Sequence, residues 1–249
     1  MIVTPVKTHT ITTDDTDLIR VIDKYLTQFK NKSVLVITSK VVSICEGNVV
    51  EKREGLDRDD LVPQESEWYI PREMNKWGFC LSISRNTLIA SGGIDESNAD
   101  NKYVLWPKDP QQSANAVREY LVKRFSIKHA GVIIIDSHTT PLRWGVTGIG
   151  ISHSGFKALK KYIGTPDLFG RDFKVTNQNV MDGMSAAAGL VMGEGRESTP
   201  LVLIEDLPFV EFQDRNPTKE ELDHLAIDRE EDVYWGILKF APWKKGKKK

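Results

Sequence analysis

The sequence predicts a single domain in which β-strands and α-helices are mixed. Continuous runs of β-branched and aliphatic residues, typical of buried strands, occur at 34–37, 131–135 and 201–204. Between them lie segments with apolar residues at helical spacing, and neither an internal repeat nor a flexible linker divides the chain. With 249 residues, of which 40% are hydrophobic, the chain has ample apolar material for a packed core.

The first third of the chain predicts a helix, three strands and an irregular region. The helix is expected to begin at Thr13 or Asp14, with an apolar stripe from Leu18 to Leu26. Residues 51–78 are charged and contain two prolines, so we expect an irregular excursion with room for a short helix. The strands expected here lie at 34–37, 49–50 and 80–84, and the last of them has 87–90 as its hairpin partner.

The rest of the chain alternates between helices and strands. Asp109 followed by Pro110 predicts a helix that continues to Phe125. The strand at 131–135 is expected to end at Asp136-Ser137. The remaining expected elements are a helix from 176 or 177 to 192 that Gly193 ends, a strand at 201–204, and helices at 219–226 and 235–240.

Composition and charge argue against several classes of protein. The 34 basic and 35 acidic side chains give a net charge of -1, which offers no reason to expect a nucleic-acid partner. The single domain is expected to span residues 1–243, and the lysine-rich residues 244–249 to form a disordered tail. Without a signal peptide or an apolar run near the roughly 20 residues that span a bilayer, we expect a cytoplasmic protein that binds no membrane. Cys45 and Cys80 lack disulfide or metal-site spacing and are expected to be buried.

Carboxylates occur at three places where folds usually avoid them. Asp95 lies in a glycine-containing turn, Asp136-Ser137 follows a wholly apolar strand, and Glu194 lies between two glycines beyond a helix. Such oxygens suit hard cations like Mg²⁺ or Mn²⁺, which bridge nucleotide phosphates. Taken singly, each residue is more often a turn or capping residue, and no Walker-type or Gly-x-Gly-x-x-Gly motif is present. The pattern alone indicates no more than a metal-dependent phosphate enzyme.

Four motifs, in this order along the chain, resemble those of the coenzyme F420-0:γ-glutamyl ligase family. They are SKVVSICEG at 39–47, GIDESN at 93–98, DLFGR at 167–171 and MGEG at 192–195. The resemblance implies a GTP-dependent ligase that joins L-glutamate to a carboxylate of a deazaflavin cofactor through an acyl phosphate. It also implies an α+β fold with a mixed sheet, an intertwined homodimer, and two divalent cations, Mg²⁺ or Mn²⁺, with K⁺ as a further candidate ion.

The same resemblance assigns roles to individual residues. The metal ligands that it implies are Asp95, Asp136, Ser137 and Glu194. The nucleotide contacts that it implies are Thr4, Pro5, Val6, Lys7, Ser39, Lys40, Asn98, Met192, Gly193, Gly195 and Arg196. No catalytic base is identified, and the candidates for a catalytic role are Lys40, His138 and Arg143. His153 is also near the site, but a lone histidine more often makes structural hydrogen bonds.

Two positions depart from the family pattern. Ile44 stands where a lysine is common and Thr140 where an arginine is usual, with Arg143 or Lys40 as candidates to compensate. These departures leave the acceptor open between a deazaflavin and a pterin such as tetrahydrofolate. A non-catalytic nucleotide- or cofactor-binding protein of the same fold is the other alternative.

Overall fold

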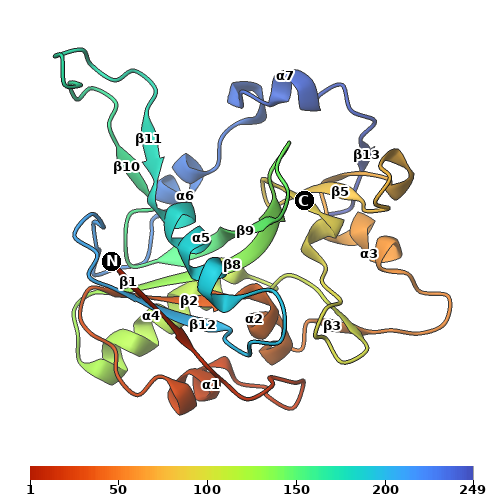
Figure 1. Cartoon of the computed structure of the whole chain (residues 1–249), viewed down its shortest axis with the longest axis horizontal. Helices are drawn as coiled ribbons and strands as arrows, with labels where there is room; N and C mark the ends of the chain where they lie inside the picture. The colour runs from red at the N-terminus through yellow and green to blue at the C-terminus, as the bar shows by residue number, and fades with distance from the viewer. Residues whose placement is uncertain (249) are drawn as a thin grey trace.

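A mixed five-stranded sheet lies at the centre of the computed structural model, which describes residues 1–248 (Figure 1). Only β2 and β8 run parallel, and the other neighbours are antiparallel, which confirms the predicted mixed sheet. The strands, in spatial order, are β1 (Ile2–Val6), β12 (Leu201–Glu205), β2 (Ser33–Thr38), β8 (Ala130–Thr139) and β9 (Val146–Ser154).

Helices cover both faces of this sheet, which explains why its central strands are apolar without alternation. In β2, Leu35 and Ile37 pack against one group of helices, whereas Val34 and Val36 face the opposite side. The first group consists of α1 (Leu18–Tyr25), α2 (Ser39–Cys45) and α4 (Pro110–Phe125), and α5 (Val180–Met192) covers the other face. The buried core therefore positions the candidate site residues that lie just after β2 and α5 and in the second half of β8.

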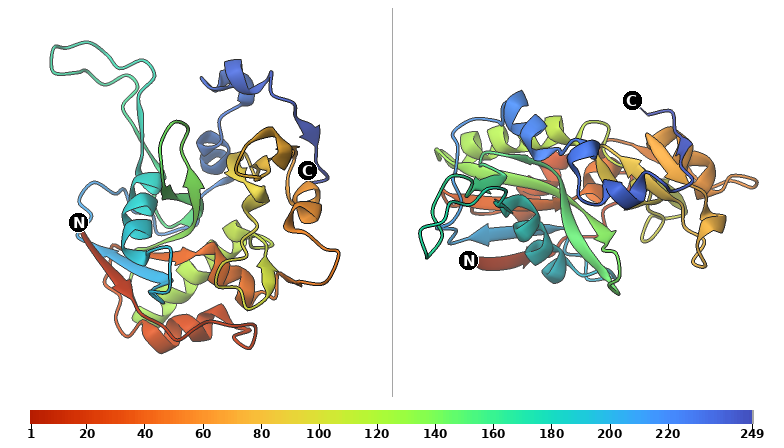
Figure 2. Two further views of the ribbon diagram at one scale, coloured as in Figure 1. Left: turned by 45° about the vertical axis from the view of Figure 1, so that its right-hand side comes forward. Right: turned by 90° about the horizontal axis from the view of Figure 1, so that it is seen from above.

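The region around residues 51–104 forms a smaller lobe beside the main sheet (Figure 2). The excursion at 51–78, which was expected to be irregular with room for a short helix, contains a helix and also a strand. Its elements are β3 (Val49–Glu51), α3 (Arg58–Glu65), β4 (Trp68–Ile70), η1 (Arg72–Met74), β5 (Leu81–Ser84), β6 (Thr87–Ala90), η2 (Ser91–Gly93) and β7 (Lys102–Val104). Strands β5 and β6 form the predicted hairpin, and β3 pairs with β7.

Residues 244–248 do not form the disordered tail that the sequence predicted for 244–249, of which Lys249 lies outside the described residues. Lys244 and Lys245 form β13, which pairs with β4 and extends the smaller sheet to the order β13-β4-β5-β6. Beyond it, Lys248 reaches Glu65 with an Nζ to carboxylate distance of 2.5 Å. Without β13, the edge of β4 would leave backbone N–H and C=O groups unpaired. The lysine side chains of β13 remain exposed to water.

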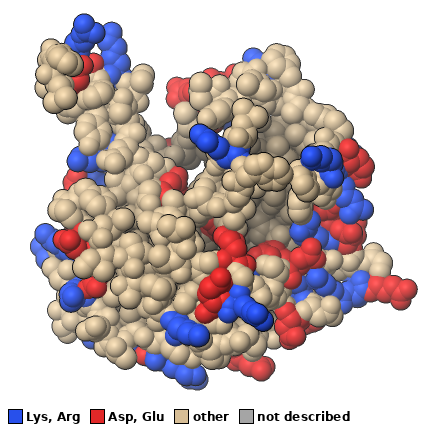
Figure 3. Space-filling model, viewed as in Figure 1, with Lys and Arg blue, Asp and Glu red and all other residues tan. Residues whose placement is uncertain are grey.

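Residues 155–200 and 206–243 complete the fold. Strands β10 (Leu159–Lys161) and β11 (Asn177–Asn179) are the base of an arm that projects from the body (Figures 1, 2 and 3). The remaining elements are α6 (Lys219–Leu225), η3 (Arg229–Glu231) and α7 (Trp235–Leu238). Within residues 1–248, no helix combines the length and apolar character that crossing a bilayer requires.

Among the element boundaries that differ from the sequence-based prediction, three show how contacts outside the element decide. Helix α1 was expected to begin at Thr13 or Asp14 but begins at Leu18 with Asp17 as its cap, because Thr12 and Asp15 close a turn before it through two hydrogen bonds. Strand β8 does not end at Asp136 but continues to Thr139, since β9 pairs with it along that length. Helix α5 begins only at Val180, because the three residues before it form β11.

Candidate functional site

One cavity of about 270 Å³ collects residues from several separate parts of the chain. Its wall includes the N-terminal turn of α2, the turn after η2, the second half of β8 and the loop after α5. The four residues proposed as metal ligands, Asp95, Asp136, Ser137 and Glu194, all line it. Residues up to 99 positions apart in sequence thus face one space.

Asp95 and Lys40 form an ion pair in this cavity. The Lys40 ammonium lies 2.7 Å from the Asp95 carboxylate and also donates to the backbone oxygen and hydroxyl of Ser97, at 2.8 and 3.0 Å. The other carboxylate oxygen of Asp95 accepts the Ser97 backbone N–H at 2.7 Å. Burial raises the pKa of Asp95, but the charge of Lys40 and these hydrogen bonds outweigh it and hold the pKa below its usual value.

Asp136 is held by a tryptophan that sequence analysis did not single out. The indole N–H of buried Trp106 donates to the Asp136 carboxylate, whose other oxygen accepts the Ser137 backbone N–H at 2.8 Å. Burial raises the pKa of Asp136 to about 6 against these hydrogen bonds, and the nearby Asp95 charge adds to the rise. Gly93 permits the approach of the indole, since a Cβ there would lie 2.3 Å from the ring.

The loop after α5 closes another side of the cavity. Glu197 folds back so that its carboxylate accepts the Gly195 backbone N–H at 2.9 Å. The amide of Asn98 donates to the Gly195 carbonyl at 2.9 Å and so ties this loop to the turn that carries Asp95. Burial raises the pKa of Glu194, Lys40 opposes the rise, and the charges of Asp95 and Glu197 add to it.

The cavity therefore combines several carboxylates with a single lysine. Among residues 1–248, no set of three or more histidine, cysteine, aspartate or glutamate side chains has the arrangement of a ready-made metal site. The donor atoms are all oxygens, however, and the raised pKa values of Asp136 and Glu194 reflect burial together with the negative charge around them. A cation bound here would offset that charge.

Comparison with known proteins identifies the family. The family model described as F420-0:Gamma-glutamyl ligase matches residues 60–206, more than half of the chain. A coenzyme F420:L-glutamate ligase of Methanococcus maripaludis is 34% identical over 235 residues, which cover 89% of this chain and 91% of that protein. Proteins of the same name from Archaeoglobus fulgidus and Methanocaldococcus jannaschii are 32% and 30% identical, over 85% and 81% of this chain and 88% and 84% of theirs. The chain belongs to the F420-0:γ-glutamyl ligase family.

Most of the nucleotide contacts that the F420-0:γ-glutamyl ligase resemblance implies lie at this cavity, but not all. Those among its lining residues are Lys40, Asn98, Met192, Gly193, Gly195 and Arg196. Thr4, Pro5 and Val6 instead lie within β1, paired with β12, and neither they nor Lys7 line the cavity. The segment that does line it comes directly afterwards, from Thr8 to Ile11. Ser39 is buried as the first residue of α2.

Two of the three candidate catalytic residues do not line the cavity. His138 lies in β8 opposite Thr147, and Arg143 lies in the exposed turn between β8 and β9. Thr140, the other departure from the F420-0:γ-glutamyl ligase pattern, is in the same turn, so neither it nor Arg143 contributes to the cavity wall. Lys40 alone of the candidates is part of that wall.

Ile44 does lie at the site, where a lysine is common in the F420-0:γ-glutamyl ligase family. It lines the main cavity and also a second cavity of about 250 Å³, whose other lining residues include Ile11, Val49 and Val104. Ile44 thus adds an apolar side chain where the two cavities meet, at a boundary that Thr10, Ile11 and Asn98 also line. His153, by contrast, is a buried structural residue of β9 that packs edge-on against Phe156, with 5.2 Å between ring centroids.

Proposed function

We propose that this chain is a GTP- and divalent-metal-dependent ligase that adds L-glutamate to a carboxylate of coenzyme F420-0 or a related cofactor. The observation that carries the proposal is the convergence of Asp95, Asp136, Ser137 and Glu194 on one cavity that Lys40 also lines. The names of its relatives, coenzyme F420:L-glutamate ligases matched over most of their length, supply the substrate class.

The residues at the cavity fit one or two Mg²⁺ or Mn²⁺ ions. Three carboxylates and one hydroxyl offer the hard oxygen donors that these ions prefer. The Lys40 ammonium already occupies one carboxylate, which indicates that this position favours positive charge. When bound, the ions would screen the charge of the triphosphate during phosphoryl transfer.

The side chains of the cavity would act by positioning the substrates and by electrostatic stabilisation. Lys40 supplies a fixed positive charge, and the backbone of the glycine-containing loop 193–195 can approach phosphate oxygens closely. The acceptor carboxylate would attack the γ-phosphorus of GTP, releasing GDP and forming an acyl phosphate. The glutamate amine would then attack the acyl carbon, lose a proton and displace phosphate. Catalysis rests mainly on orientation and electrostatics.

Turnover with defined acceptors tests the proposal. The protein is incubated with GTP, Mn²⁺ and L-glutamate, and with either coenzyme F420-0 or tetrahydrofolate, and GDP and product mass are measured. We expect acceptor-dependent GDP release and a product heavier by one glutamyl residue. Product with tetrahydrofolate alone would move the acceptor to the pterins. Nucleotide binding without turnover in any mixture would favour a non-catalytic binding protein.

We also propose that the chain acts as a homodimer in which the arm contacts a second copy. Leu168 and Phe169 at the tip of the arm are 99% and 90% exposed, which is unfavourable for apolar side chains in water. The double variant Leu168→Asp, Phe169→Asp should shift the wild-type dimer to monomer in sedimentation velocity. A monomeric wild-type protein at micromolar concentration, or a variant that stays dimeric, would overturn this assembly.

A further inference from the structure

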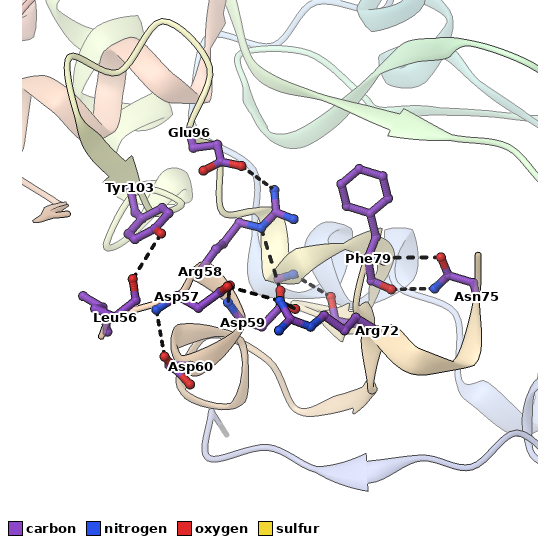
Figure 4. Close-up of polar contacts among 12 residues, drawn as sticks. Leu56, Asp57, Arg58, Asp59, Asp60, Arg72, Asn75, Phe79, Glu96 and Tyr103 are labelled. Carbon is purple, nitrogen blue, oxygen red and sulfur yellow. Dashed lines mark hydrogen bonds and ion pairs between the residues drawn. The ribbon is translucent and has the colours of Figure 1, made fainter. Parts of the chain in front are cut away.

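The turn that carries Asp95 and Asn98 is attached to the smaller lobe through Glu96. Asp95, Ser97 and Asn98 line the cavity, but Glu96 does not. Its carboxylate instead makes two ion pairs with the excursion at 51–78, at 3.0 Å from Lys52 Nζ and 3.4 Å from Arg58 Nη1 (Figure 4 shows the second). Glu96 therefore joins the candidate site to a region that contributes no other charge to this turn.

Both cations are held in place by contacts of their own. Arg58 is only 16% exposed, lies over the Phe79 ring at 5.3 Å, and begins α3, whose first turn is fixed by a capping box at Asp57. Its buried Nε atom makes no hydrogen bond and lies 3.9 Å from the Asp59 carboxylate, whereas Nη1 donates a hydrogen bond to Glu96. The Lys52 ammonium lies 5.0 Å from the centre of the Tyr103 ring. Tyr103 belongs to β7, the strand that pairs with Asp95.

Other contacts already hold the turn on either side of Glu96: Lys40 contacts Asp95 and Ser97, and Asn98 donates to the Gly195 carbonyl. Asp95 is fixed on one side by reciprocal backbone hydrogen bonds with Val104, at 2.9 and 2.8 Å. Three residues later Asn98 takes a left-handed conformation, with φ of 52°, which non-glycine residues adopt at a cost. Between these two points, the ion pairs of Glu96 fix the direction in which the turn leaves the strand.

We propose that Glu96 is a positioning residue that holds Asp95 and Asn98 toward the nucleotide and metal, although it touches neither. The expected effect of Glu96 on the enzyme rests on the proposed function. The restraint of the turn by Glu96 is independent of that function. Ion pairs on a surface contribute little to global stability, so the effect should be local. A displacement of about 1 Å at a phosphate site costs up to about 100-fold in rate.

The test compares Glu96→Gln with Glu51→Gln. Glu51 is the matched control, because it also pairs with a lysine of this lobe, at 3.6 Å from Lys102, but is 70% exposed and makes no contact with the turn. Backbone hydrogen exchange at 95–98 is measured in the protein alone, and affinity for GTP with Mn²⁺ by calorimetry. We expect Glu96→Gln to speed hydrogen exchange and to weaken nucleotide affinity, each about tenfold, and to leave the KM for the acceptor unchanged. Glu51→Gln should give wild-type values in all three measurements.

A second set of variants separates positioning from direct ligation. The double variant Lys52→Met, Arg58→Met should reproduce the losses of Glu96→Gln, and adding Glu96→Gln to it should have no further effect. A further loss of nucleotide affinity in that background would show Glu96 to be a ligand itself and would overturn the proposal, as would wild-type exchange in Glu96→Gln. If the wild-type protein binds no nucleotide, the proposed function fails, and exchange alone still decides whether Glu96 restrains the turn.

Discussion

Lys40 lies 2.7 Å from Asp95 and directs its remaining hydrogen bonds to Ser97, so the ammonium group is committed to the turn at 95–98. The pair brings the start of α2 to a turn of the smaller lobe. Because both side chains line the cavity, the pair also sets its electrostatic character. Lys40 thus has two roles to separate, as a partner that orients Asp95 and as a positive charge for phosphate.

Replacing Lys40 with methionine separates these two roles. Lys40→Met keeps most of the apolar stem but removes the charge, so kcat/KM for GTP should fall roughly 10- to 100-fold, the range for loss of one charged hydrogen bond. Affinity for Mn²⁺ without nucleotide should stay equal or rise, since Asp95 loses a competing cation. Steady-state kinetics and metal titration measure the two effects. A variant with unaltered GTP kinetics would exclude Lys40 from the site.

Asp136→Asn tests the proposed metal ligand that burial perturbs most. Asparagine has nearly the same shape and keeps an oxygen for the Trp106 indole, so the fold should persist while metal-dependent turnover falls at least about 100-fold. Because the folded pKa of about 6 lies above the ordinary value of 3.8, the wild-type protein loses stability as pH rises from about 4 through about 6. The variant should lack this pH dependence in thermal melts, although its single amide oxygen can accept from the Trp106 indole but no longer also from the Ser137 N–H.

The matched control for that variant is Asp182→Asn. Asp182 is a partly buried carboxylate of α5 that accepts the Gly150 backbone N–H at 2.9 Å, and it does not line the cavity. We expect this control to retain turnover. Equal losses in Asp136→Asn and Asp182→Asn would point to a general effect of removing buried charge and would argue against metal ligation by Asp136.

His153 predicts an acid-dependent loss of stability outside the site. Burial lowers the pKa of His153 to about 4, and its Nδ1 atom has no hydrogen-bond partner. An unfolded chain takes up this proton near pH 6.5, so stability present above that pH is lost as pH falls toward 4, by up to roughly 3 kcal/mol. Urea unfolding of wild type and His153→Phe from pH 7 to 4.5 measures the difference. Parallel pH curves for the two proteins would refute this prediction.

Gly148 sets how closely β9 approaches α5 beside the cavity. A Cβ at Gly148 would lie 2.3 Å from the Ser185 carbonyl oxygen, whereas a Cβ at Gly183 of the same helix meets nothing within 4 Å. Gly148→Ala should therefore destabilise the protein by about 1–3 kcal/mol through overpacking. Gly183→Ala should stabilise it by about 0.5–1 kcal/mol through helix propensity. Chemical denaturation of both variants gives the comparison, and equal shifts would contradict it.

Local pattern predicted the core well because the decisive interactions are local or periodic. The apolar runs in β2, β8 and β12 indicate strands buried on both faces, and Asp109-Pro110 marks the start of α4. The failures arise where contacts outside an element decide. Thr13 and Asp14 were plausible helix starts, but Asp15 closes a turn with Thr12 and the helix begins only at Leu18. The charged C-terminal lysines gave no sign of the open edge of β4.

The site was predicted in its carboxylates but not in their supports. Asp95, Asp136 and Glu194 stood out because charge beside glycine or at the end of an apolar strand is unusual. Nothing in the sequence links Trp106 to Asp136, or Glu96 to Arg58, since each pair is at least 30 positions apart and joined only by tertiary packing. The same holds for the segment from Thr8 to Ile11, which lines the cavity in place of the predicted residues of β1.

The most direct test of the convergent oxygen site is a crystal soaked with Mn²⁺ and a non-hydrolysable GTP analogue, measured at a wavelength where manganese scatters anomalously. We expect anomalous peaks within coordination distance of Asp95, Asp136 and Glu194, with the triphosphate of the analogue beside them and Lys40 nearby. Manganese or triphosphate bound elsewhere, with these three carboxylates left to water, would contradict the metal-dependent mechanism.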